Sequence, residues 1–152
     1  MPGHASVKLD RSELAAWRGF LGVHAAVVRR LDEDLRAAHG VSLSEYEVLL
    51  LLSEAPGGRR RLGELAAAGL ITQSGGSRMV DRLAKGGLVE RERCDDDRRG
   101  SFATLTDGGR AALARARETH LAGVRRLFLE PTADMHAALA GAWRAVLGPL
   151  DG

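Results

Sequence analysis

The chain has 152 residues, 45% of them hydrophobic and 28% charged, and a formal net charge of +2 at neutral pH. This length and composition are typical of one soluble globular domain and exclude a disordered chain. The longest apolar run, 48–52, is far too short to cross a bilayer, and the first residues lack the apolar core of a signal peptide. We therefore expect a cytoplasmic protein with no membrane partner.

Charge and cysteine content narrow the function classes further. Residues 59–110 carry eleven basic and eight acidic side chains, a net of +3, and the rest of the chain comes to −1. This bias agrees with a nucleic-acid partner without establishing one. Cys94 is the only cysteine, which excludes an intramolecular disulfide and a cysteine-rich metal site.

The first predicted element is a long helix over 12–39, ended by Gly40. Its apolar positions are spaced alternately by three and four residues, the pattern of a helix buried against another helix. The stripe consists of Leu14, Trp17, Leu21, His24, Val28, Leu31 and Leu35. The spacing favours packing in the core or in a subunit interface over a cofactor-binding face.

Three short helices are predicted next. Ser44 is placed to cap a helix that runs through 52, and the Pro-Gly-Gly sequence at 56–58 closes it with a turn. The second helix covers 59–71. Its inward positions are Leu62, Leu65, Ala66 and Leu70. The third helix is capped by Thr72 and ends at Gly86. Its apolar side consists of Met79, Val80 and Leu83.

The second half of the chain begins with a predicted β-hairpin, because residues 88–93 and 101–106 alternate like strands around a polar turn. Thr106 then caps a long helix over 107–129, and Pro131 begins a final helix. The apolar positions of that helix are Met135, Leu139, Trp143, Val146 and Leu147. The predicted fold is mainly α with a small β-hairpin, a winged helix-turn-helix whose flanking helices would bury their stripes in a dimer.

Two segments, in this order, resemble the MarR family of transcriptional regulators. RMVDRLAKGGLVER over 78–91 is similar to the recognition-helix pattern of that family, and DDDRRGSFATLTDGGR over 95–110 is similar to its wing. The wing signature matches at Asp97, Arg99, Leu105, Thr106 and Gly108. The resemblance covers essentially the whole chain, because the order and lengths of the predicted helices also agree.

The resemblance implies a homodimer that binds a palindromic operator in double-stranded DNA, mostly as a repressor. It also implies release by a small effector, often aromatic or phenolic, or by oxidation. The chain would divide into an N-terminal dimerisation helix (1–39), a winged helix-turn-helix region (40–106) and C-terminal dimerisation helices (107–152). No cofactor is implied.

The third short helix would be the recognition helix. Short polar side chains at its start reach base edges, and Arg pairs with guanine or phosphate. The candidates are Gln73, Ser74, Ser77 and Arg78. Arg82 has two alternatives, a phosphate contact or a local ion pair, and Thr72 caps the helix with any phosphate contact secondary. Gly75-Gly76 departs from the family pattern at its second position. Two explanations stay open: the weak helix propensity of glycine is tolerated there, or the glycine allows the backbone to approach DNA more closely.

The hairpin tip carries Arg98 and Arg99. A narrow minor groove concentrates negative potential and attracts inserted Arg side chains. The resemblance places the groove contact at Arg99, held in position by an ion pair with Asp97, and Arg98 at the DNA backbone. The alternative is a surface turn whose charges cancel.

Other chemistry is less favoured by the sequence. Cys94 lies beside Arg93, which would suit a reactive thiolate, so a redox-sensing regulator of the same fold is one alternative. A metal site is disfavoured, because Cys94 and the three aspartates that follow it point in different directions. The histidines are scattered without a nucleophile motif, which disfavours a small enzyme. Trp17 and His24 are the candidates to line an effector pocket, with plain core packing as the alternative.

Overall fold

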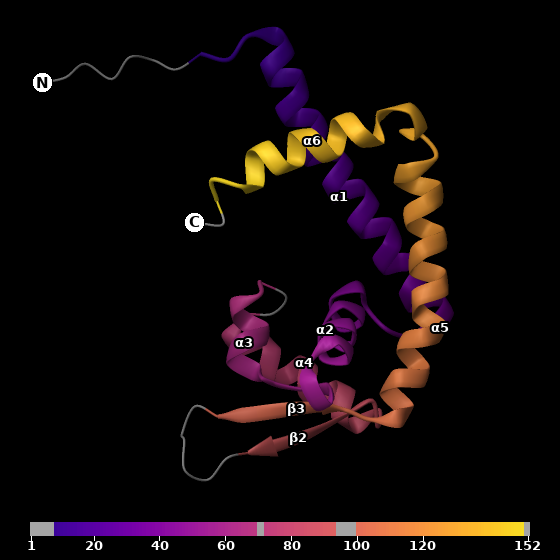
Figure 1. The fold of residues 1–152 in the computed structure, drawn as a ribbon. Coiled ribbons are helices and arrows are strands. Elements are labelled where there is room, and N and C mark those ends of the chain that lie inside the picture. The colour runs from indigo at the N-terminus through magenta and orange to yellow at the C-terminus, as the bar shows by residue number, and fades with distance from the viewer. Residues whose placement is uncertain (1–7, 70–71, 94–99, 151–152) are drawn as a thin grey trace, which may run out of the picture.

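The computed structural model describes residues 8–69, 72–93 and 100–150, apart from the side chains of Gln73 and Ser74. The helices are α1 (Arg11–His39), α2 (Leu43–Glu54), α3 (Leu62–Ala67), α4 (Gln73–Lys85), α5 (Asp107–Val124) and α6 (His136–Leu147). The strands are β1 (Arg59–Arg61), β2 (Val89–Arg93) and β3 (Ser101–Leu105). Helices α2 to α4 and the sheet form one body, from which α1 and α5 extend together (Figure 1). The predicted mainly α fold is confirmed.

Helix α1 begins and ends where the sequence places its signals. Asp10 accepts hydrogen bonds from the backbone amides of Ser12 and Glu13, and the Glu13 side chain accepts one from the Asp10 amide in return. This capping box satisfies amides that have no partner within the helix. At the other end Gly40 has φ +67°, a conformation that favours glycine. The predicted range of 12–39 is therefore confirmed to within one residue.

The cap of α2 differs from the prediction. Ser42, not Ser44, accepts a hydrogen bond from the amide of Glu45, and the Glu45 carboxylate accepts one from the amide of Ser42. Both serines fit the pattern Ser-x-x-Glu, because Glu45 and Glu47 each lie three residues after a serine. The observed start of α2 leaves Ser44 in its first turn and Glu47 without a capping role.

The predicted hairpin is part of a three-stranded antiparallel sheet with the order β1-β3-β2. Strands β2 and β3 pair from Val89 opposite Leu105 to Arg93 opposite Ser101. Strand β1 was predicted as part of a helix, and that prediction is wrong. Its three arginines pair with Phe102–Thr104, because β3 would otherwise leave one row of backbone groups unpaired.

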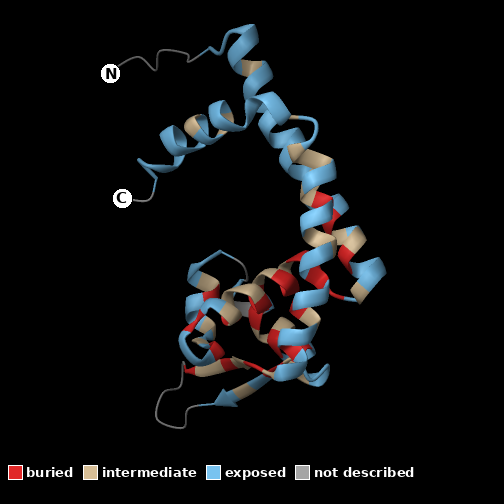
Figure 2. Cartoon of the chain, turned by 45° about the vertical axis from the view of Figure 1, so that its right-hand side comes forward, coloured by how far each residue is buried: buried red, intermediate tan, exposed pale blue. Residues whose placement is uncertain are grey.

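The hydrophobic core is centred on α2, whose Val48, Leu49 and Leu52 have no exposed surface. Four surrounding elements each add a fully buried side chain: Leu35 of α1, Leu65 of α3, Val80 of α4 and Ala103 of β3. Burying one Leu or Val stabilises a fold by ~1.5–3 kcal/mol relative to leaving it exposed. The core of the winged helix-turn-helix body therefore also includes parts of α1 and α5, and its residues are among the red segments of Figure 2.

The outer parts of α1 and α6 carry apolar side chains that the single chain does not bury (Figure 2). Only Leu31 and Leu35 of α1 are buried, and α6 has no buried residue. The exposed large apolar residues of these helices are Trp17, Phe20, Leu21, Val23, Val28, Trp143, Val146 and Leu147. The predicted stripe of α1 is thus divided between the core and an exposed face. No described helix has the length and apolarity that a membrane span requires.

The connection between α5 and α6 also differs from the prediction. After α5 the chain continues as a wider helical turn over Arg125–Leu129 and a 3-10 turn over Ala133–Met135. Thr132 has φ −115°, and its hydroxyl donates a 2.6 Å hydrogen bond to the carbonyl of Phe128. The last helix therefore begins at His136 rather than at Pro131. The predicted cap of α5 is confirmed, because Thr106 accepts from the amide of Gly109.

His120 of α5 is expected to make the stability of the fold depend on pH. Its ring lies 4.6 Å from the Tyr46 ring, and its Nδ1 atom is buried with no hydrogen-bond partner among the described residues. Burial lowers the pKa of His120 from its ordinary value of 6.5. The unfolded chain then binds more protons below pH 6.5, so the free energy of unfolding should fall as the pH drops through that value. Urea unfolding at pH 8 and pH 5.5 measures this loss, and His120→Gln should show less of it.

Candidate functional site

The start of α4 combines a threonine cap with a first turn that has no acidic residue. Thr72 accepts a 2.9 Å hydrogen bond from the amide of Gly75, which confirms the predicted cap. A side chain at position 75 would bring its Cβ within 2.6 Å of the Thr72 hydroxyl, so glycine permits this close cap. No acidic residue occurs in the first turn. No carboxylate of that turn therefore neutralises the positive end of the helix dipole.

The predicted recognition residues follow along α4. Gln73 and Ser74 lie in its first turn, with side chains outside the described ones. Thr72 and Arg78 are exposed and Ser77 is partly buried. Among the described residues, the Arg78 side chain has no hydrogen bond or ion pair, so its guanidinium is available to another molecule. Gly76 is buried, which places it on the side of α4 that faces the body.

Of the two alternatives for Arg82, the structure shows an ion pair, but its partner is distant in the sequence. Its Nε atom lies 3.2 Å from Oε1 of Glu45, whose other oxygen accepts from the amide of Ser42. The Glu45 side chain is 11% exposed, whereas that of Arg82 is 62% exposed. One carboxylate therefore caps α2 and holds α4 at the same time. The remaining N–H groups of Arg82 still face solvent.

Arg91 of β2 joins α4 to the sheet. Its NH1 group lies 2.6 Å from Oδ1 of Asp81 and 3.5 Å from the carbonyl of Ser77, and its NH2 group donates to the hydroxyl of Ser101 at 3.3 Å. Only 15% of the Arg91 side chain is exposed, and its Nε atom is buried with no hydrogen-bond partner in the described part of the chain. A planar guanidinium with several donors can hold three groups in a fixed arrangement. Arg91 thus fixes the orientation of α4 relative to β3.

The outer face of the sheet carries a second arginine arrangement. The guanidinium of Arg59 lies 3.8 Å from the centre of the Phe102 ring, and its NH2 atom lies 2.6 Å from the Glu92 carboxylate. Arg61 lies over the same ring at 5.0 Å. These contacts tie β1 to both other strands. They also place positive charge on the face of the sheet that points away from the helices.

The predicted wing residues lie outside the described part of the chain. Asp97, Arg98 and Arg99 belong to the segment 94–99 that joins β2 to β3, as does the redox candidate Cys94. Their roles stay predictions. The strands on both sides of that segment are placed, and Arg91 and Ser101 fix them to α4.

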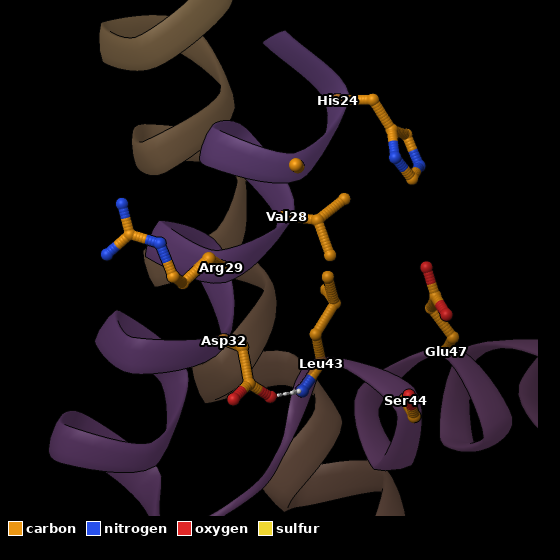
Figure 3. Close-up of a pocket in the computed structure, with 8 residues that line it drawn as sticks. His24, Val28, Arg29, Asp32, Leu43, Ser44 and Glu47 are labelled. Carbon is orange, nitrogen blue, oxygen red and sulfur yellow. Dashed lines mark hydrogen bonds between the residues drawn. The ribbon is translucent and has the colours of Figure 1, made fainter. Parts of the chain in front are cut away.

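A cavity of about 450 Å³ lies between α1 and α2 (Figure 3). Its lining residues are His24, Ala25, Val28, Arg29, Asp32, Leu43, Ser44 and Glu47. The structure thus places His24 at this cavity. Trp17 does not line it; its ring stacks with that of Phe20, 5.9 Å away, on the exposed face of α1. Within the described residues, no group of three or more His, Cys, Asp or Glu could hold a metal ion.

Three features of the site were not predicted. The role of Arg91 could have been predicted, because the alternation along β2 puts it on the same inward face as the buried Val89, where an arginine requires partners. No sequence pattern predicted the roles of Glu45 and Glu47. The partner of Glu45 and the surroundings of Glu47 come from helices distant in the sequence.

Comparisons with known proteins agree with this geometry. Residues 39–100 match a sequence model described as MarR family. A MarR family transcriptional regulator from Streptomyces coelicolor, Sco3205, solved in complex with DNA, is 34% identical; the match covers 95% of this chain and 91% of that one, with a TM-score of 0.83. AbsC, another from that organism, is also 34% identical, covering 94% and 99%, with a TM-score of 0.75. The HTH-type transcriptional repressor YetL of Bacillus subtilis is 28% identical over 72% of this chain and 67% of its own. The chain therefore belongs to the MarR family, whose members are transcriptional regulators and not enzymes.

Proposed function

We propose that this protein is a homodimeric repressor that binds a palindromic operator in double-stranded DNA and is released by a small molecule. The observation that carries the proposal is the start of α4, where Thr72 and Gly75 are exposed, Thr72 caps the helix and the first turn has no acidic residue. Gln73, Ser74, Ser77 and Arg78 follow from there. We infer that this helix enters the major groove, where such side chains read base edges.

The wing would contact the neighbouring minor groove. Arg99 would insert into the groove, Asp97 would hold it in position, and Arg98 would contact the DNA backbone. The brace of Arg91 supports this proposal, because it fixes α4 and the strands of the wing as one unit. Arg82 has exposed donors left over from its pair with Glu45 and would contact a phosphate.

The ends of the chain, 1–39 and 107–152, would form the dimerisation region around the DNA-binding region at 40–106. The support is the exposed apolar face of α1 and the absence of buried residues on α6. Apolar surface of this extent is uncommon on a monomer and is typical of an interface. A two-fold dimer would present two α4 helices to two half-sites, which explains why the operator would be palindromic.

Release by an effector would use the cavity between α1 and α2. The first two turns of α2 supply both its wall, through Leu43 and Ser44, and the clamp on α4, through Glu45. At the same point Asp32 of α1 accepts a 2.8 Å hydrogen bond from the amide of Leu43. A ligand that moves the start of α2 would therefore displace Glu45 and with it Arg82 of the recognition helix.

The test is footprinting of the purified protein on DNA from upstream of its own coding region. A two-fold symmetric protected site whose affinity falls steeply with salt is expected.

Arg78→Ala and Arg99→Ala should each weaken binding about tenfold, since a good base contact is worth ~1–3 kcal/mol. Arg115→Ala removes the same charge from an exposed position on α5 and serves as the control. Equal affinities for all three variants would show that α4 and the wing do not contact the DNA.

A further inference from the structure

The cavity between α1 and α2 contains one carboxylate that the fold does not use. Because the capping box of α2 is formed by Ser42 and Glu45, Glu47 is left to face the cavity. Its carboxylate points toward the ring of His24 across the opening (Figure 3). Among the described residues it has no hydrogen bond and no ion pair. Burial raises the pKa of Glu47, as expected for a carboxylate that is partly removed from water and unpaired.

The other charged groups of the cavity already have partners. Asp32 accepts from the amide of Leu43 at 2.8 Å and pairs with Arg36 at 2.7 Å. Arg29 points away from Glu47 (Figure 3) and pairs with Glu33 at 3.2 Å. The free charge that a ligand would meet is therefore the negative charge of Glu47.

The rest of the lining suits an apolar body. Val28 and Leu43 face each other beside Glu47 and His24 (Figure 3), and Ala25 adds a small side chain. A volume of about 450 Å³ admits a bicyclic aromatic ring. The ring of His24 offers one nitrogen as a hydrogen-bond partner at the opening.

From this arrangement we infer that the cavity binds a cationic aromatic or arylalkyl amine, whose ammonium group pairs with Glu47 while its ring lies against Val28 and Leu43. Only the role of this ligand as the effector rests on the proposed function; its binding in the cavity does not. It differs from the phenolic class that the family resemblance favours, because a neutral phenol would give Glu47 only an uncharged donor and a carboxylate would meet it as a like charge, whereas an ammonium group forms a charge-assisted pair. A charge-assisted pair at a partly desolvated carboxylate discriminates strongly between these classes.

Three compounds that share a naphthalene ring test this inference: 1-naphthylmethylamine, 1-naphthylmethanol and 1-naphthoate. Isothermal titration of the full chain should give the tightest binding for the amine, weaker binding for the alcohol and the weakest for the carboxylate. Glu47→Gln should weaken amine binding about tenfold or more and leave the alcohol nearly unchanged. Glu54→Gln removes the same charge from an exposed position at the far end of α2, away from the cavity, and should change neither.

The inference is overturned if the wild-type protein binds the three compounds equally or prefers the carboxylate, a result that needs no variant. It is also overturned if the two Gln variants behave alike. Operator binding is measured separately by fluorescence anisotropy with and without the amine. If the amine binds through Glu47 but no operator is bound in its absence, the cavity assignment stands and the proposed regulatory function fails.

Discussion

Replacing Leu147 by Asp should turn the protein into a monomer and weaken operator binding by a factor of about 100 or more. Leu147 and its neighbour Val146 on α6 are 53% and 57% exposed in the single chain. Burying one such side chain contributes ~1.5–3 kcal/mol, and a two-fold interface contains the substitution twice. An unpaired Asp in that interface adds the cost of desolvating a charge. A monomer would contact only one half-site of the operator.

Light scattering coupled to size exclusion measures the oligomeric state of the Leu147→Asp variant, and anisotropy measures its operator affinity. Ala145→Asp is the matched control, because position 145 lies two residues from both Trp143 and Leu147 and so on the opposite side of α6 from them. The control should remain a dimer with unchanged affinity. Since α6 has no buried residue, both variants should keep the circular dichroism of the folded core. A Leu147→Asp protein that remains dimeric would show that α6 does not form the interface.

Much of the fold could be predicted because its helix boundaries depend on local chemistry. Gly40, Thr72 and Thr106 each act on groups within four residues along the chain, so their roles follow from the sequence alone. The same rules could not choose between Ser42 and Ser44, since both fit a capping box. The observed choice goes with the burial of Leu43 and Tyr46, which depends on the elements packed around α2.

Features that depend on distant partners were harder to predict. Strand β1 consists of three arginines with no apolar alternation, and it forms because the edge of β3 accepts it. The unused carboxylate of Glu47 becomes visible only when α1 and α2 enclose a cavity. Of the two predicted pocket residues, the structure places only His24 at the cavity. Helical periodicity predicts which face of α1 a residue occupies, but not the position along that face where a second helix packs.

Removing Arg91 should weaken operator binding about 10- to 100-fold even though the residue would not contact DNA. Arg91→Ala releases Asp81 and the carbonyl of Ser77 on α4, and the hydroxyl of Ser101 on β3. The recognition helix and the wing would then lose their fixed relative orientation, and contacts made by both at once require that orientation. A loss of this size corresponds to ~1.4–2.7 kcal/mol of binding energy. Unfolding in urea, measured in parallel, separates this effect from a loss of folded protein.

The variant Asp81→Asn distinguishes an internal brace from a direct contact with phosphate. If Arg91 acts by holding Asp81, Asp81→Asn should also weaken binding, although it removes a negative charge from the helix that we propose to face DNA. The double variant should then lose less than the sum of the single losses, because both substitutions break the same 2.6 Å pair. If Arg91 instead contacts phosphate, Asp81→Asn should strengthen binding or leave it unchanged, and the two effects should add. The sign of the Asp81→Asn effect alone decides between these two roles, since only the brace makes a lost negative charge harmful to DNA binding.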